Sequence, residues 1–86
     1  DLRAPGALRL LPRRGRAGPE DVRLVGFDDL GVAESAEPAL TTVASPVVRM
    51  SQVAGELLLC RIGALPRHRE PQERLFGTRL VVRESA

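Results

Sequence analysis

An apolar run that stops at two adjacent carboxylates constrains this chain more than any other feature. The run extends from Val22 to Phe27 and is followed directly by Asp28 and Asp29. A short, nearly continuous apolar segment between turn signals is typical of a strand that is buried on both faces of a parallel sheet. We therefore predict a strand over residues 22–27 that ends at the two acidic residues.

The residues before and after this strand predict further elements. Residues 1–14 carry apolar side chains at helical spacing, and this helix should end near Leu11 because Pro12 has no N–H group to donate. Residues 30–37 predict a short helix that Pro38 ends, and residues 40–43 predict a second strand. A last strand is expected around residues 80–82.

The clearest predicted helix covers residues 45–63. Ser45 is its expected N-cap, Pro46 stands at its first position, and Gly63 follows its end. Its apolar face is predicted to comprise Val47, Met50, Ala54, Leu57, Leu58 and Ile62. The elements then follow the order αβ(α)βαβ, which indicates an α/β fold with a mainly parallel sheet.

Composition narrows the classes of function. The 86 residues suffice for one small domain, and all 13 basic residues are Arg, interspersed with 11 acidic ones for a net charge of +2. A nucleic-acid-binding surface would instead gather its basic residues on one face. Cys60 and His68 have no partners at metal-ligand or catalytic spacing, so we expect no metal, no cofactor and no enzyme activity. Within these residues we find no signal peptide and no apolar run long enough to span a membrane.

The chemistry of the residues leaves two roles open for Asp28. Ligands of open α/β sheets bind outside the carboxyl ends of the strands, where a carboxylate can accept hydrogen bonds from hydroxyl or ring N–H groups. Alternatively, Asp28 and Asp29 only end the strand and cap the next helix. The frequency of Asp in turns and caps favours this second role.

Five blocks of sequence, in one order across nearly the whole chain, carry a family resemblance. They are Pro19-Glu20-Asp21-Val22, Val25 to Asp29, Pro38 with Leu40 to Val43, Met50 with Ala54, Leu57 and Leu58, and Leu80 to Ser85. In this order they resemble the C-terminal part of a LacI/GalR-type transcriptional regulator. The resemblance implies a partial periplasmic-binding-protein-like (type I) fold, in which residues 1–86 are a C-terminal fragment of a two-lobed effector-binding domain.

The resemblance also implies roles for single residues. Asp28 is expected to contact a small polar effector, such as a sugar, and Ser45 stands where family members often line the pocket. The hinge between the lobes is expected at Thr41, Thr42 and Val43. The dimer interface is expected at Leu30, Gly31, Val32, Ala33 and Ser35.

The resemblance finally implies a cytoplasmic homodimer that binds operator DNA only through an N-terminal helix-turn-helix domain, which these 86 residues do not contain. The chain begins with Asp1 rather than Met, and we interpret it as a piece of a longer protein. Two alternatives stay open at this point: a fragment of a related extracytoplasmic sugar-binding protein, and a fragment of an α/β enzyme.

Overall fold

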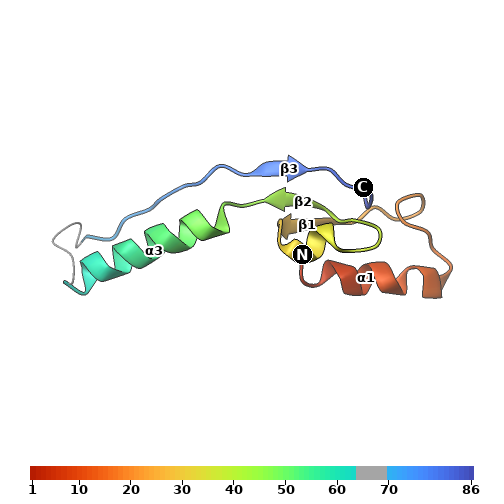
Figure 1. Ribbon diagram of the computed structural model, residues 1–86, viewed down its shortest axis with the longest axis horizontal. Helices are drawn as coiled ribbons and strands as arrows, with labels where there is room; N and C mark the ends of the chain where they lie inside the picture. The colour runs from red at the N-terminus through yellow and green to blue at the C-terminus, as the bar shows by residue number, and fades with distance from the viewer. Residues whose placement is uncertain (64–69) are drawn as a thin grey trace. The chain divides into compact units, whose positions relative to one another are not determined.

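The computed structural model describes residues 1–63 and 70–86 (Figure 1). Its elements are α1 (Ala4–Leu10), the 3₁₀ helix η1 (Pro12–Arg14), β1 (Val25–Asp28), α2 (Gly31–Glu34), β2 (Thr41–Ala44), α3 (Val47–Arg61) and β3 (Arg79–Val81). The chain divides into two compact units, which are described separately. Unit 1 comprises Asp1–Ser45 and Thr78–Ala86, and unit 2 comprises Pro46–Gly77.

The prolines determine the bounds of the N-terminal helix. Pro5 lies in the first turn of α1, where its missing N–H group costs no hydrogen bond. The helix ends at Leu10, before Pro12, and a 3₁₀ turn follows. Gly15 closes this turn with a φ of 66°, a left-handed conformation that glycine adopts without steric cost. The predicted end near Leu11 is confirmed.

The sheet in unit 1 contains three strands in the order β1-β2-β3. β1 runs parallel to β2, with Val25 opposite Thr41 and Asp28 opposite Ala44. β3 runs antiparallel to β2. The sheet is therefore mixed, whereas the sequence predicted a mainly parallel one. That prediction rested on the order of the elements, but the helix α3 between β2 and β3 does not fix the direction of β3, which pairs antiparallel to β2.

The core of unit 1 lies on one face of this sheet. Leu8 of α1, Ala33 of α2 and Leu40 form a buried cluster, with Ala4, Leu11, Leu24 and Ala36 packed around it. Gly26 of β1 faces this side as well, and a side chain there would collide with Leu40 and with the carboxylate of Asp1. The lack of a Cβ at Gly26 thus allows the core to approach the strand closely.

The opposite face of the sheet carries exposed apolar side chains. Phe27, Val43 and Leu80 lie side by side in the strand register, and Phe27 and Leu80 are 54% and 59% exposed. The prediction of burial on both faces of β1 was therefore wrong for this chain. The side chains of a strand alternate between faces, and in unit 1 the helices that contribute to the core cluster cover only the face of Gly26.

Helix α3 of unit 2 begins one residue later than predicted. Its N-cap is Pro46 rather than Ser45, because the carbonyl oxygen of Pro46 already accepts a helical hydrogen bond from the N–H group of Met50 at 2.9 Å. At the other end, Gly63 has a φ of 81° and its N–H group donates to the carbonyl oxygen of Cys60 at 3.2 Å. Gly63 thus has the predicted role just after the helix.

The covered stripe of α3 differs from the predicted apolar face. Cys60 is buried, as expected for a small apolar side chain, and Val53 and Leu57 are half-buried. Met50, Leu58 and Ile62 are exposed. Leu57, Leu58 and residues 70–72 of the same unit border a pocket of about 340 Å³. Residue spacing predicted which residues of α3 are apolar. Which of them are covered depends on the segment that packs against the helix, and spacing does not predict that segment. His68 lies outside the described residues.

Candidate functional site

The strand register brings the two predicted binding residues to one edge of the sheet. Asp28 is the last residue of β1 and stands opposite Ala44, the last residue of β2. Ser45 follows Ala44 directly and is half-buried. The carboxyl ends of parallel strands meet at the same edge, and ligands of open α/β sheets bind outside that edge. Asp28 and Ser45 are therefore neighbours at the position where the sequence predicted a ligand site.

The two adjacent aspartates have different environments. The carboxylate of Asp29 forms an ion pair with the guanidinium group of Arg83, at 2.8 Å. The carboxylate of Asp28 makes no hydrogen bond or ion pair with any described residue. Both residues have positive φ angles, 97° for Asp28 and 55° for Asp29, which side-chain-bearing residues rarely adopt. Asp29 thus has a structural partner, whereas the acceptor atoms of Asp28 have none among the described residues.

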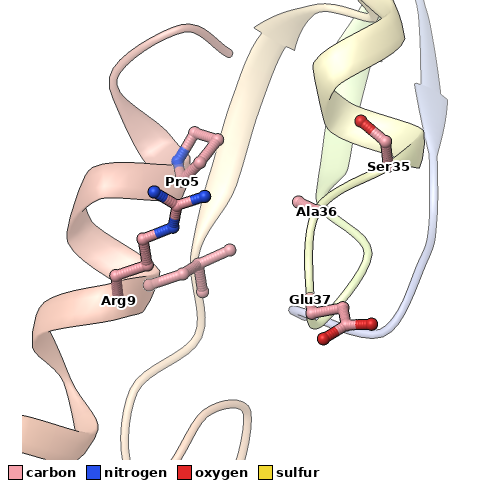
Figure 2. Close-up of a pocket in the computed structure, with 6 residues that line it drawn as sticks. Pro5, Arg9, Ser35, Ala36 and Glu37 are labelled. Carbon is pink, nitrogen blue, oxygen red and sulfur yellow. The ribbon is translucent and has the colours of Figure 1, made fainter.

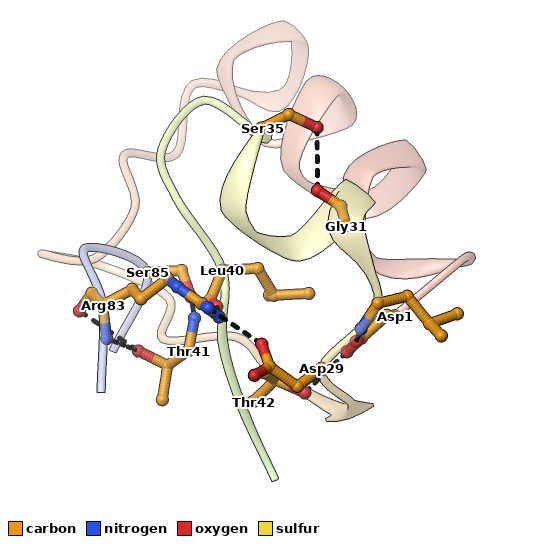
Figure 3. Close-up of polar contacts among 10 residues, drawn as sticks. Asp1, Asp29, Gly31, Ser35, Leu40, Thr41, Thr42, Arg83 and Ser85 are labelled. Carbon is orange, nitrogen blue, oxygen red and sulfur yellow. Dashed lines mark hydrogen bonds and ion pairs between the residues drawn. The ribbon is translucent and has the colours of Figure 1, made fainter. Parts of the chain in front are cut away.

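Neither aspartate caps the helix that follows. The N-cap residue of α2 is Leu30, and no described side chain makes a capping hydrogen bond to this helix. The N–H group of Leu30 instead donates to Oδ2 of Asp1 at 2.7 Å, and Oδ1 of Asp1 accepts from the hydroxyl of Thr42 at 2.7 Å (Figure 3). The predicted capping role of Asp28 and Asp29 is thus wrong. The N-cap residue is Leu30, and its N–H group binds the carboxylate of Asp1, which is distant in sequence.

The predicted hinge residues belong to a buried polar network. Thr41 and Thr42 are buried in the central strand, and Val43 is half-buried. The N–H group of Thr41 donates to the hydroxyl of Ser85 at 2.8 Å, and that hydroxyl donates to the carbonyl oxygen of Leu24 at 2.7 Å. The hydroxyl of Thr41 accepts from the N–H group of Arg83 at 2.8 Å. A hinge at these residues stays a prediction.

Sequence reasoning missed the roles of Asp1, Arg83 and Ser85. Arg83 donates to the carbonyl oxygen of Leu40 at 3.0 Å in addition to its ion pair (Figure 3). The available signal was the polar segment Arg83-Glu84-Ser85 directly after the apolar run of β3. Polar side chains that follow a strand and lie among buried backbone groups usually form hydrogen bonds with those backbone groups. The sequence does not say which strand they reach.

The residues predicted for a dimer interface fall into two groups. Ala33 is 0% exposed and belongs to the core cluster, so its side chain offers no surface to a second subunit. This corrects its assignment, because α2 is amphipathic and turns Ala33 inward. Gly31 and Ser35 are exposed, with the Ser35 hydroxyl donating to the carbonyl oxygen of Gly31 at 3.1 Å. Leu30 and Val32 are half-buried and remain candidates with them.

A pocket of about 280 Å³ lies between α1 and the α2 segment (Figure 2). Pro5, Leu8 and Arg9 line it from α1, and Ser35, Ala36 and Glu37 line it from the other side. Arg9 and Glu37 form no ion pair with each other or with another described residue. The lining of this pocket therefore combines apolar side chains with one charge of each sign, neither of which is paired with a described residue.

Other kinds of site find no support in the described part of the chain. There, no group of three or more His, Cys, Asp or Glu side chains is arranged to hold a metal ion. Cys60 is a free, buried thiol. No helix among the described residues has the length and the apolar character needed to cross a membrane.

Unit 1 is a small mixed α/β unit in which Asp28, at the end of the parallel strand β1, has no side-chain partner among the described residues. Residues 1–86 match the family of periplasmic binding protein-like domains, and the chain belongs to this family. Its curated relatives include LacI-type regulators. The transcriptional regulator CelR of Thermobifida fusca is 45% identical over 85 residues, which cover 99% of this chain and 24% of CelR. MalR of Streptomyces coelicolor is 42% identical, with the same coverage.

Solved structures show the same relationship. A complex of the regulator CelR with cellobiose superposes with a TM-score of 0.83 at 44% identity, over 95% of this chain and 24% of that one. A LacI family regulator of Enterococcus faecium with bound ribose has a TM-score of 0.77 at 35% identity, over 93% of this chain and 29% of that one. The chain thus spans about a quarter of the length of the relatives it matches.

Proposed function

We propose that this chain is the C-terminal part of the effector-binding domain of a LacI/GalR-type transcriptional regulator. The family match over residues 1–86 and the names of the relatives support this proposal. The regulator is cytoplasmic, has no enzyme activity, and binds operator DNA through a helix-turn-helix domain outside these residues. The named relatives are regulators, which favours this function over an extracytoplasmic sugar-binding protein.

The effector is a small polar molecule, and a sugar fits the site best. A carboxylate can accept hydrogen bonds from two vicinal hydroxyl groups, and hydrogen bonds to a charged acceptor are stronger than those between neutral groups. The relatives of known structure include one with cellobiose and one with ribose. The observation that carries this proposal is the carboxylate of Asp28, which lies at the carboxyl edge of the sheet and has no partner among the residues that the structure describes. Ser45 contributes a hydroxyl group beside it.

The regulator acts as a homodimer in this proposal. The exposed side of α2, with Leu30, Gly31, Val32 and Ser35, forms part of the interface together with α1. The pocket between these helices supports this arrangement, because its apolar side chains and the charges of Arg9 and Glu37, which pair with no described residue, can receive side chains of a second subunit. Thr41, Thr42 and Val43 act as a crossing strand at the hinge between the lobes.

Effector binding tests the role of Asp28. We expect Asp28→Ala, in the regulator that carries this chain, to weaken the binding of cellobiose or ribose by roughly tenfold to hundredfold. A lost hydrogen bond to a charged group costs about 1.5–3 kcal/mol, and each ~1.4 kcal/mol is a factor of ten in affinity. Isothermal titration calorimetry with both sugars measures the change. Operator binding in a mobility-shift assay should stay unchanged.

Glu20→Ala is the matched control, since Glu20 is an exposed carboxylate that lies in a turn away from the strand ends. It should leave the affinity for both sugars at the wild-type value. Equal affinities for the wild type and Asp28→Ala would contradict the proposed role of Asp28.

A further inference from the structure

The turn between β1 and α2 holds the proposed ligand residue in an unusual conformation. Asp28 and Asp29 both have positive φ angles, and two such residues in sequence are rare outside glycine. The strand pairing of Asp28 with Ala44 places its backbone. The direction of its side chain, however, depends on the conformation of the turn that follows. Such conformations persist only where the surrounding contacts hold them.

Two contacts hold this turn, and both come from distant parts of the chain. Arg83 pairs with the carboxylate of Asp29 at 2.8 Å, directly after Asp28. Asp1 accepts the N–H group of Leu30, one residue later, at 2.7 Å. In Figure 3 Arg83 lies on one side of the turn, where it pairs with Asp29, and Asp1 lies on the other side of the turn. The turn is therefore clamped immediately after the residue that is to meet the ligand.

Arg83 is itself held firmly. Its side chain also donates to the carbonyl oxygen of Leu40 at 3.0 Å, and its backbone N–H group donates to the hydroxyl of Thr41 at 2.8 Å. The side chains of Arg83 and Asp29 are only 19% and 23% exposed, so solvent screens this pair less than a pair on the open surface. A planar guanidinium group that binds a carbonyl and a carboxylate at once has a defined orientation.

We propose that Arg83 is a positioning residue for the effector site. It does not reach the ligand itself. By pairing with Asp29 it neutralises one of two adjacent carboxylates and keeps the turn in the conformation that leaves the acceptor atoms of Asp28 free. The proposal rests on the proposed function of Asp28, and it gives the C-terminal segment that follows β3 a role in positioning the binding residue.

The affinity for cellobiose and ribose in the intact regulator tests this role. Arg83→Gln is expected to weaken binding by about tenfold, within the range of couplings measured between residues of one network. Asp29→Asn, which removes the charge pair but keeps the other contacts of Arg83, should weaken binding less. Arg23→Gln is the matched control, because Arg23 is an exposed arginine that precedes β1 and has no ion pair to any described residue. It should bind both sugars as the wild type does.

A double-mutant cycle separates positioning from a general effect on folding. If Arg83 acts through Asp28, Arg83→Gln should change the affinity little in an Asp28→Ala background. An equal loss in both backgrounds would overturn the proposal, and so would unchanged affinity of Arg83→Gln beside a weakened Asp28→Ala. Should Arg83→Gln fail to fold, the same cycle with Asp29→Asn decides.

A second measurement does not depend on the sugar. The carboxyl carbon of Asp28, observed by NMR after selective labelling of aspartate, should shift or broaden in Arg83→Gln while the signals of Arg23→Gln match the wild type. An unchanged Asp28 signal in Arg83→Gln would contradict positioning. Failure of the wild type to bind either sugar would count against the proposed function alone, and this measurement would still decide the role of Arg83.

Discussion

The two units of the chain are stabilised in different ways. Unit 1 has a buried apolar cluster and a network of hydrogen bonds between residues that lie 26 to 61 positions apart in sequence. Unit 2 contains one long helix whose ends are set by neighbouring residues, and most of its apolar side chains are exposed. The difference teaches that unit 1 depends on long-range contacts, whereas α3 depends mainly on local ones.

The same truncation should therefore have unequal effects in the two units. Leu40→Ala removes a fully buried side chain of unit 1, and we expect a loss of about 2–5 kcal/mol in stability. Leu58→Ala removes a side chain of α3 that is 60% exposed, and the expected change is within about 0.5 kcal/mol. Hydrogen exchange of the 86-residue chain, followed by mass spectrometry, measures both. Equal losses would show that the exposed face of α3 is covered, and the contrast between the units would fail.

The polar network of unit 1 should be the next most sensitive feature. Ser85→Ala removes a hydroxyl that binds the N–H group of Thr41 and the carbonyl oxygen of Leu24, both in a buried environment. A buried group left without its partner costs about 1–3 kcal/mol. Ser51→Ala, at an exposed position of α3, is the control and should be neutral or slightly stabilising. Urea denaturation monitored by circular dichroism compares them, and a neutral Ser85→Ala would remove the network as a source of stability.

Two glycines of unit 2 should give the smallest effects, with opposite signs. Gly63→Ala places a side chain at a φ of 81° and should fray the end of α3, at a cost of about 1 kcal/mol. Gly55 lies within the helix, where an added Cβ would meet no atom within 4 Å. Gly55→Ala should stabilise α3 by about 0.5–1 kcal/mol. Helix content by circular dichroism reports both changes. A common sign would mean that local geometry does not control this helix.

The candidate site was partly predictable from the sequence. The family resemblance and the end of the apolar run both pointed to Asp28, and the parallel register of β1 and β2 placed Ser45 beside it. The ion pair that distinguishes Asp29 from Asp28 in the structure was not predictable. It depends on Arg83, which reaches Asp29 only after the chain has passed through both units.

The sequence by itself determined the elements that rest on local rules. Pro12 ends α1 because it lacks an N–H group, and Gly63 follows α3 because it accepts a left-handed conformation without a steric penalty. The order of motifs also determined the family. Each of these signals depends on residues that are adjacent or a few positions apart.

Only the tertiary structure decided which side chains are buried and which charged and polar groups have partners. It covered Gly26 and left Phe27 exposed, although both belong to the same apolar run. It paired Asp29 with Arg83. It also placed the N–H group of Leu30 against the carboxylate of Asp1 and the buried N–H group of Thr41 against the hydroxyl of Ser85. These choices depend on which distant segments meet, and a hydrogen bond forms only where donor and acceptor come within about 3 Å of each other. A local pattern of residues therefore does not predict which distant donor and acceptor atoms come this close.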